Sequence, residues 1–235
     1  MLTERQKAIL EAVIREYVAS AEPVASEHIV RKYRLPASPA TVRNELLVLD
    51  EAGFLDQPHT SAGRVPTDKG YRFFINHLMG GDGIAKREEA ALRELHELED
   101  PVDFVRQASR LFSELTRAFS LSGLPDDELY YKFGIRTVLR EPEFSDTRLM
   151  HEFSALVDVI EDEFERLFDP AEFAEPKVFI GAENPIRFAR HCGMIVQTLE
   201  APSGREGVIA LIGPKRMDYQ HHLALLKYFH EMLEI

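Results

Sequence analysis

Arg43 and Asn44 stand next to each other and carry the hydrogen-bonding groups that read the edges of base pairs. A guanidinium can donate to O6 and N7 of guanine, and a carboxamide can pair with N6 and N7 of adenine. Each such bidentate pair contributes roughly 1 to 3 kcal/mol of discrimination between bases. Taken alone, the two side chains are equally typical of a hydrated helix surface, so the elements that position them decide what they do.

Strong start and stop signals place these two side chains near the beginning of a helix. Ser38 can accept a hydrogen bond from a free backbone amide, and Pro39 fits the first helical position. The helix is expected to run to Ala52 and to stop at Gly53. At 100° per residue it has an apolar inward face and an outward face that is small and polar near the N-terminus. The inward residues are Val42, Leu46 and Leu49, and the outward residues are Ala40, Arg43, Asn44 and Leu47, with Thr41 at the margin.

Two further helices precede this one. Thr3 and Gln6 can form a capping box for a helix that ends near residue 19, where the sequence AEPV interrupts it. Ser26 is the expected N-cap of a short helix through Tyr33, and RLPA is a tight turn. Helix, short helix, turn and helix is the order of a helix-turn-helix motif, whose second element lies in the major groove of DNA.

The segment FLDQPHTSAGRVP, residues 54–66, is predicted to form a hairpin before a helix capped by Thr67. FLDQ is its first strand, PHTSAG the turn and RVP the returning strand. Such a wing lies along the DNA backbone or enters the minor groove, whose negative potential favours Arg and His. In this hairpin, His59 and Arg64 are expected to probe the groove, and the hydroxyl groups of Thr60 and Ser61 to bind phosphate. Gly63 would allow close backbone approach, and Lys69 and Arg72 on the next helix would bind phosphate. Hairpins with one His and one Arg are common, so this prediction depends on the preceding helices.

The net charge of −12 disfavours a nucleic-acid partner at first, but it is unevenly distributed. Residues 1–80 contain ten Lys/Arg and ten Asp/Glu, whereas residues 81–235 contain 18 and 30. Cations cluster between Arg31 and Arg43 and again between Arg64 and Arg72. Local positive patches can therefore coexist with an acidic chain, although a solvated charged surface explains the same clusters.

The composition is that of an ordered cytoplasmic protein: 235 residues, 45% of them hydrophobic, suffice for one large domain or two ordinary ones. The single cysteine cannot form an internal disulfide, which fits a reducing cytoplasm. The N-terminal sequence MLTERQKAILEAVIREY mixes charged and apolar residues, so neither a signal peptide nor a transit sequence is expected. No run of about 18 uncharged apolar residues occurs, so no membrane partner is expected.

A few residues suggest catalysis or metal binding, but each lacks the partners that such a site requires. Cys192 follows a histidine, but neighbours on a strand point to opposite faces, and no orienting residue stands out. His221 and His222 lack the spaced partners of a zinc site and are expected at the surface. Glu183 and Asn184 follow a predicted strand and are typical either of a small-molecule pocket or of ordinary loop polarity. We therefore expect no enzyme activity, no metal and no cofactor.

A dense glycine cluster, GGDG at residues 80–83, is predicted to separate two domains. Beyond it, Asp100 and Pro101 begin a helix with an apolar seam, which is either a core face or a contact between subunits. The seam consists of Val105, Ala108, Phe112, Leu115 and Phe119. Strands are predicted at 129–135, 177–181, 192–200 and 207–213, with helices at 146–168 and 219–234. The second half is thus predicted to be an α+β domain.

Several strings of the sequence resemble a known family. SPATVRNEL and QPHTSAGRVPTDKGYRF are similar to the winged helix of the bacterial heat-inducible transcription repressor HrcA, and REPEFSD, VFIGAEN and GVIALIGPKRMDY resemble its C-terminal segments. The resemblance implies a winged helix-turn-helix domain over residues 1–79 and, beyond the glycine-rich linker at 80–83, a partial GAF-like regulatory and dimerisation domain over 84–235. It also implies that DNA is read by the helix from Ser38 to Asn44 and by the wing from His59 to Arg64.

The resemblance further implies repression of heat-shock chaperone genes by a homodimer at an inverted-repeat operator in double-stranded DNA, with the chaperonin supporting the active state. The chain departs from the family between SELTRAFSLSG and LPDDELYYKFGIRTVLREPEF, where an inserted dimerisation domain, and with it some early strands, is expected to be missing. A dimer is still expected, because one winged helix reads too few base pairs for a genomic operator. The alternative is a winged-helix ligand-sensing or protein-interaction regulator with another operator or without a chaperonin response.

Overall fold

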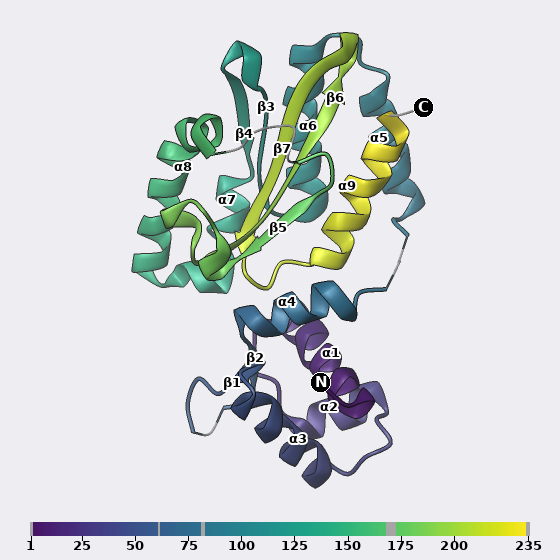
Figure 1. Cartoon of the computed structure of the whole chain (residues 1–235), viewed down its shortest axis with the longest axis vertical. Coiled ribbons are helices and arrows are strands. Elements are labelled where there is room, and N and C mark those ends of the chain that lie inside the picture. The colour runs from purple at the N-terminus through teal and green to yellow at the C-terminus, as the bar shows by residue number, and fades with distance from the viewer. Residues whose placement is uncertain (1, 61, 81–82, 168–172, 234–235) are drawn as a thin grey trace. The chain divides into compact units, whose positions relative to one another are not determined.

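The computed structural model describes residues 2–60, 62–80, 83–167 and 173–233 (Figure 1). Contacts within the chain divide it into two compact units, Met1–Gly80 and Gly81–Ile235. The predicted linker at 80–83 includes residues 81 and 82, which lie outside the described residues. Each unit has its own core and is described by itself.

The described residues of the first unit form four helices and a two-stranded antiparallel hairpin. The elements are α1 (Glu4–Ser20), α2 (Ser26–Tyr33), α3 (Pro39–Glu51), β1 (Leu55–Asp56), β2 (Val65–Pro66) and α4 (Asp68–His77). Three predicted N-caps are confirmed, because Thr3, Ser38 and Thr67 each accept a hydrogen bond from a backbone amide of the first helical turn. The predicted cap Ser26 is wrong: Ala25 is the N-cap, and Ser26 is a buried residue of the helix itself.

Apolar side chains from all four helices form the core of the first unit. They include Ile9, Leu10 and Val13 of α1, Ile29 of α2, Val42, Leu46 and Leu49 of α3, and Tyr71 and Phe74 of α4. Ion pairs join the helices at the edge of this core: Arg5 lies 2.7 Å from Glu45, and Glu16 lies 2.5 Å from Lys32 and 3.0 Å from His28. Burial raises the pKa of Glu16, but Lys32 and His28 outweigh it, so the net shift is downward.

In the second unit, the residues that the structure describes form a five-stranded antiparallel sheet with helices on both faces. Its longer elements are α5 (Lys86–His96), α6 (Pro101–Thr116), β3 (Phe119–Leu124), β4 (Leu129–Phe133), α7 (Ile135–Val138), α8 (Thr147–Leu167), β5 (Lys177–Ile180), β6 (Cys192–Ala201), β7 (Arg205–Pro214) and α9 (Tyr219–Leu233). The strand order is β4-β3-β7-β6-β5. The predicted α+β fold is confirmed, and the predicted strands and helices agree with these bounds within a few residues.

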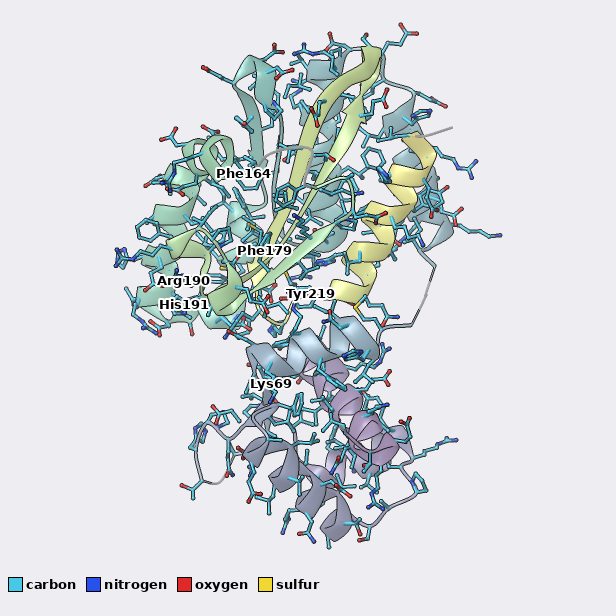
Figure 2. The ribbon with its side chains drawn as sticks, viewed as in Figure 1. Lys69, Phe164, Phe179, Arg190, His191 and Tyr219 are labelled. Carbon is cyan, nitrogen blue, oxygen red and sulfur yellow. The ribbon has the colours of Figure 1, made fainter. Side chains whose placement is uncertain are left out.

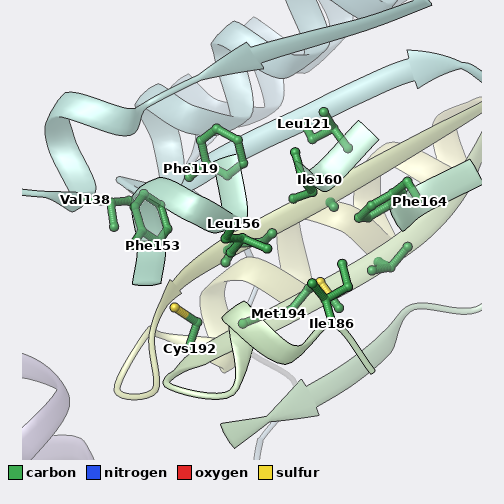
Figure 3. Packing of buried hydrophobic residues seen from close by; sticks show 14 of the residues in the cluster. Phe119, Leu121, Val138, Phe153, Leu156, Ile160, Phe164, Ile186, Cys192 and Met194 are labelled. Atoms are coloured by element: carbon green, nitrogen blue, oxygen red, sulfur yellow. The ribbon is translucent and has the colours of Figure 1, made fainter. Parts of the chain in front are cut away.

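The two faces of the sheet are covered by different helices, because successive side chains of a strand point to opposite sides. On one face, Met194 of β6 packs in a cluster with Leu156 and Ile160 of α8 (Figure 3). On the other face, the rings of Phe112 of α6 and Phe229 of α9 lie with centroids 5.3 Å apart. Both faces are thus occupied by the unit's own helices.

The predicted apolar seam is neither one continuous helix stripe nor an exposed contact. Val105, Ala108 and Phe112 are fully buried inside the unit, so they cannot form a contact between subunits in this fold. Thr116 ends α6, and Phe119 is the first residue of β3, where it faces the α8 cluster. The strand was missed because its apolar residues continue the spacing of three and four that predicts a helix.

Three polar or ionisable residues of the second unit are buried, and for His222 the predicted surface position is wrong. His222 was expected at the surface, but it lies inside, and burial lowers its pKa to about 4. Cys192 is buried, and burial raises the pKa of its thiol to about 12, which removes the reactive thiolate at neutral pH. Asn184 is buried as well, and its amide donates to the carbonyl oxygens of Gly181 and Cys192 at 3.0 Å each. The amide nitrogen of Asn184 thus ties the loop after β5 to the start of β6.

Candidate nucleic-acid interface

The outward face of α3 exposes the side chains that could read bases. Ala40, Arg43 and Asn44 are exposed, Thr41 is half-buried, and the three predicted inward residues are buried. Within the part of the chain that the structure describes, no hydrogen bond or ion pair engages Arg43 or Asn44. Their donors and acceptors therefore remain available to a ligand.

The start of α3 is rigidly built. The Ser38 hydroxyl accepts a hydrogen bond from the amide of Thr41 at 3.1 Å, and the two hydroxyl groups lie 2.9 Å apart. Pro39 occupies the first helical position. The two hydroxyl groups thus serve the helix cap, and the residues one turn further on present their side chains from a fixed backbone.

The loop of the wing hairpin is held in shape by Gln57. The sequence analysis did not identify a role for this residue. Its side-chain amide donates to the carbonyl oxygens of Thr60 at 3.1 Å and Ala62 at 2.9 Å, and the amide of Ala62 donates to His59. His59 and Thr60 are exposed on this loop, and Ser61 lies outside the described residues. The only local signal for Gln57 was an amide side chain at the end of a predicted strand.

The prediction that Arg64 probes a DNA groove is contradicted, because its side chain turns inward. The side chain is 10% exposed, and its Nε lies 2.8 Å from Oδ2 of Asp50 on α3. Its backbone pairs with Val24 through two hydrogen bonds of 2.9 Å. Gly63 is needed for the same contact, since a Cβ there would lie 2.4 Å from the carbonyl carbon of Val24. The close backbone approach therefore occurs within the chain, and Arg64 ties the wing to α3.

The beginning of α4 supports the end of α3. Lys69, labelled in Figure 2, donates from Nζ to the carbonyl oxygen of Ala52 at 2.7 Å and lies 4.4 Å from the ring centroid of Phe54. Thr67 donates to the carbonyl oxygen of Gly53 at 2.7 Å. An ammonium group at this position satisfies a free carbonyl and complements the helix dipole. Lys69 is exposed and Arg72 is half-buried, and their contact with phosphate remains a prediction.

The cations at the end of α2 differ in their availability. Lys32 is paired with Glu16, whereas Arg31 and Arg34 are exposed and form no ion pair with another described residue. Arg34 follows α2 in a left-handed conformation with φ of 49°, at the start of the turn that leads to α3. Arg31 and Arg34, before α3, and Arg43 on its outward face are thus exposed positive groups of the described residues.

The three segments of the second unit that resemble the C-terminal segments of the HrcA family contact one another or the neighbouring sheet. Arg216, from GPKRMDY, lies 2.5 Å from Glu141 and 2.6 Å from Glu143, both from REPEFSD. The string VFIGAEN contributes the buried Asn184, which binds the first residue of β6. Tyr219, labelled in Figure 2, begins α9, and its hydroxyl leaves no room for a side chain at Gly193 of β6. These strings thus specify one end of the sheet and its packing.

Metal binding and membrane spanning can be examined directly in the described residues. They contain no group of three or more His, Cys, Asp or Glu side chains arranged to hold a metal ion. No helix in the same residues is long and apolar enough to cross a bilayer.

Comparisons with known proteins agree with this geometry. Residues 1–79 match the family described as winged helix-turn-helix transcription repressor, HrcA DNA-binding, and residues 67–223 match the HrcA protein C terminal domain. A crystal structure titled as that of a hypothetical protein aligns with a TM-score of 0.77 and 18% identity over 99% of this chain and 98% of that one, which supports the fold.

Curated relatives carry the name heat-inducible transcription repressor HrcA. The relative from Acetivibrio thermocellus is 27% identical over an alignment of 336 residues that covers 97% of this chain and 94% of that protein. Because this chain has 235 residues, that relative contains long segments that are absent here. The relative from Chloroflexus aggregans is 58% identical over 92 residues, which are 39% of this chain and 24% of that protein. With matches to both HrcA domains, the chain belongs to the HrcA family of heat-inducible transcription repressors.

Proposed function

We propose that the protein represses heat-shock chaperone genes by binding, as a homodimer, to an inverted-repeat operator in double-stranded DNA. The observation that carries this proposal is the exposed pair Arg43 and Asn44 on a helix with a capped, fixed start. The name of the relatives, heat-inducible transcription repressor, supports the assignment to heat-shock genes.

The residues of the first unit have distinct roles in this proposal. Arg43 and Asn44 read base edges in the major groove, while Ser38, Pro39, Ala40 and Thr41 bring the helix start close to the DNA. His59 and Thr60 contact the backbone or the minor groove from the wing. Arg31 and Arg34 neutralise phosphates beside α3. Asp50 and Arg64 set the angle between α3 and the wing, so both contact surfaces meet the duplex together.

The rest of the chain acts as the regulatory and dimerisation part. We assign DNA binding to residues 1–79, a linker to 80–83, and a partial GAF-like domain to 84–235. One winged helix covers about 600 to 1,000 Å² of interface and reads few base pairs, so an inverted repeat calls for two copies on a two-fold axis. The net charge of −12 in the second part is repelled by phosphate, which favours docking through the neutral first part. A chaperonin that supports the active state and a cytoplasmic location complete the proposal.

Footprinting tests this function. The full chain is incubated with DNA from upstream of the chaperone operons of its own organism, and the protected sequence is then used as a duplex in gel shifts. Protection of an inverted repeat, lost in an Arg43→Ala/Asn44→Ala variant that remains folded, supports the proposal. If the chain protects no such site but selects another sequence from a random duplex library, it is a regulator with a different operator.

A further inference from the structure

Two neighbouring residues of α3, Leu47 and Val48, expose large apolar side chains. Each is 45% exposed, and among the described residues only Met150 is a comparable case. Single apolar residues on a surface need no explanation, but an adjacent pair on the helix that meets a ligand does. The pair therefore indicates a contact that the isolated chain leaves open.

The two side chains point in different directions. At about 100° per residue, Leu47 projects between Arg43 and Asn44, near the middle of the outward face, whereas Val48 projects about 100° further round. Leu47 also lies one turn beyond Arg43, about 6 Å along the helix axis. This distance is close to two base-pair steps of about 3.4 Å. A helix that brings Arg43 and Asn44 to base edges thus brings Leu47 to the edge of a nearby base pair.

We propose that Leu47 contacts the C5-methyl group of a thymine in the major groove and thereby makes that base pair part of the recognised sequence. This inference rests on the proposed function, because it requires α3 to lie in the groove. The thymine methyl is the apolar group that base pairs present on the major-groove side, and apolar side chains recognise it.

The surroundings of Leu47 favour nucleic acid over a protein as the occupant. Its neighbours one turn toward the N-terminus are Arg43 and Asn44, whose donors engage no partner among the described residues and suit base edges and phosphates. An exposed carboxylate, Glu51, lies one turn further on. Phosphates repel this carboxylate, so α3 is expected to enter the groove with its N-terminal half and with Leu47 as the last contact.

Replacing thymine with uracil tests this contact, because uracil lacks only the methyl group. Each thymine of the footprinted operator is replaced in turn, and the affinities of wild type, Leu47→Ala and Val48→Ala are measured at one salt concentration. At one position in each half-site, wild type and Val48→Ala should lose about fourfold in affinity, the factor for one buried methyl group. Leu47→Ala should lose less than about 1.5-fold at that position, because its methyl partner is already gone.

Val48→Ala is the matched control, since the residue is equally exposed on the same helix. Changes that uracil causes in DNA shape act on all three proteins alike, so only the difference between variants reports the contact. A Leu47→Met variant, which keeps an apolar side chain of similar reach, should retain most of the uracil sensitivity. This second variant covers the case in which Leu47→Ala binds too weakly to measure.

Three results overturn the inference while operator binding persists. One is an equal uracil effect on wild type and Leu47→Ala at every position. Another is operator binding by wild type without uracil sensitivity, which leaves the proposed function intact. The third is a weaker dimer for Leu47→Ala in sedimentation equilibrium with unchanged uracil sensitivity, which assigns the side chain to a second copy. Absence of binding to any duplex overturns the proposed function together with the contact.

Discussion

Replacing Arg64 with Ala should destabilise the first unit without changing how its DNA affinity depends on salt. The side chain is 10% exposed and its partner Asp50 is 30% exposed, so the ion pair lies between a surface pair and a buried one. Surface pairs contribute about 0 to 1 kcal/mol, and removing one partner of a buried pair costs about 3 to 5 kcal/mol. We therefore expect Arg64→Ala to cost about 2 kcal/mol of unfolding free energy.

The mirror variant Asp50→Ala should cost more, because it leaves a nearly buried guanidinium without its carboxylate. We expect Asp50→Ala to cost about 3 kcal/mol of unfolding free energy. The double variant should cost less than the sum of the two single variants, because both remove the same ion pair. In a unit of this size, each 1 kcal/mol corresponds to a shift of about 4 to 8 °C in melting temperature. Arg64→Ala should thus melt about 8 to 16 °C lower than wild type.

Hydrogen exchange on the full chain measures the effect locally, because peptides from the first unit report its opening. Arg31→Ala is the control, as an exposed arginine of α2 whose removal should leave the exchange unchanged. The salt dependence of operator binding is measured for the same variants. Loss of one phosphate contact should flatten the slope by about 0.9. Unchanged exchange together with a flatter slope for Arg64→Ala would show that the guanidinium meets DNA and would refute the ion-pair argument.

Three further predictions concern base reading, backbone packing and pH. Arg43→Ala and Asn44→Ala should each reduce the affinity ratio of operator to scrambled duplex roughly 5- to 150-fold while non-specific binding persists; an unchanged ratio in titrations would exclude base reading. Gly63→Ala should cost about 1 to 3 kcal/mol of unfolding free energy by overpacking, because its Cβ would lie 2.4 Å from the carbonyl carbon of Val24. Hydrogen exchange measures this loss, and Gly80→Ala, whose Cβ would have no atom within 4 Å, should be neutral. The pKa of His222 is about 4 in the folded state and 6.5 in the unfolded state, so between these pH values the folded state binds fewer protons. The free energy of unfolding should therefore fall by about 3 kcal/mol as the pH drops through this window. Calorimetry checks this, and a His222→Gln variant with the same pH profile would contradict it.

Much of the first unit could be predicted from local signals. The cap at Ser38 and the helix start at Pro39 depend on residues within one turn, so neighbouring sequence letters are sufficient to recognise them. The inward and outward faces of α3 follow from the 100° step, and the exposed positions of Arg43 and Asn44 agree with it. The second unit was less predictable, since the spacing that predicts a helix also ran into the strand that begins at Phe119.

The sequence by itself determined the family, the two kinds of domain and the helix that presents Arg43 and Asn44, because these depend on short-range patterns of capping, periodicity and distinctive strings. Only the tertiary structure decided which charged groups remain for a ligand. Arg64 meets Asp50 from 14 positions away and Val24 from 40, and Lys32 meets Glu16 across two helices. Such partners are distant in sequence, and folding brings them together because a buried charge is costly without a partner. The long-range contacts therefore assign some cations to the fold and leave others exposed beside α3.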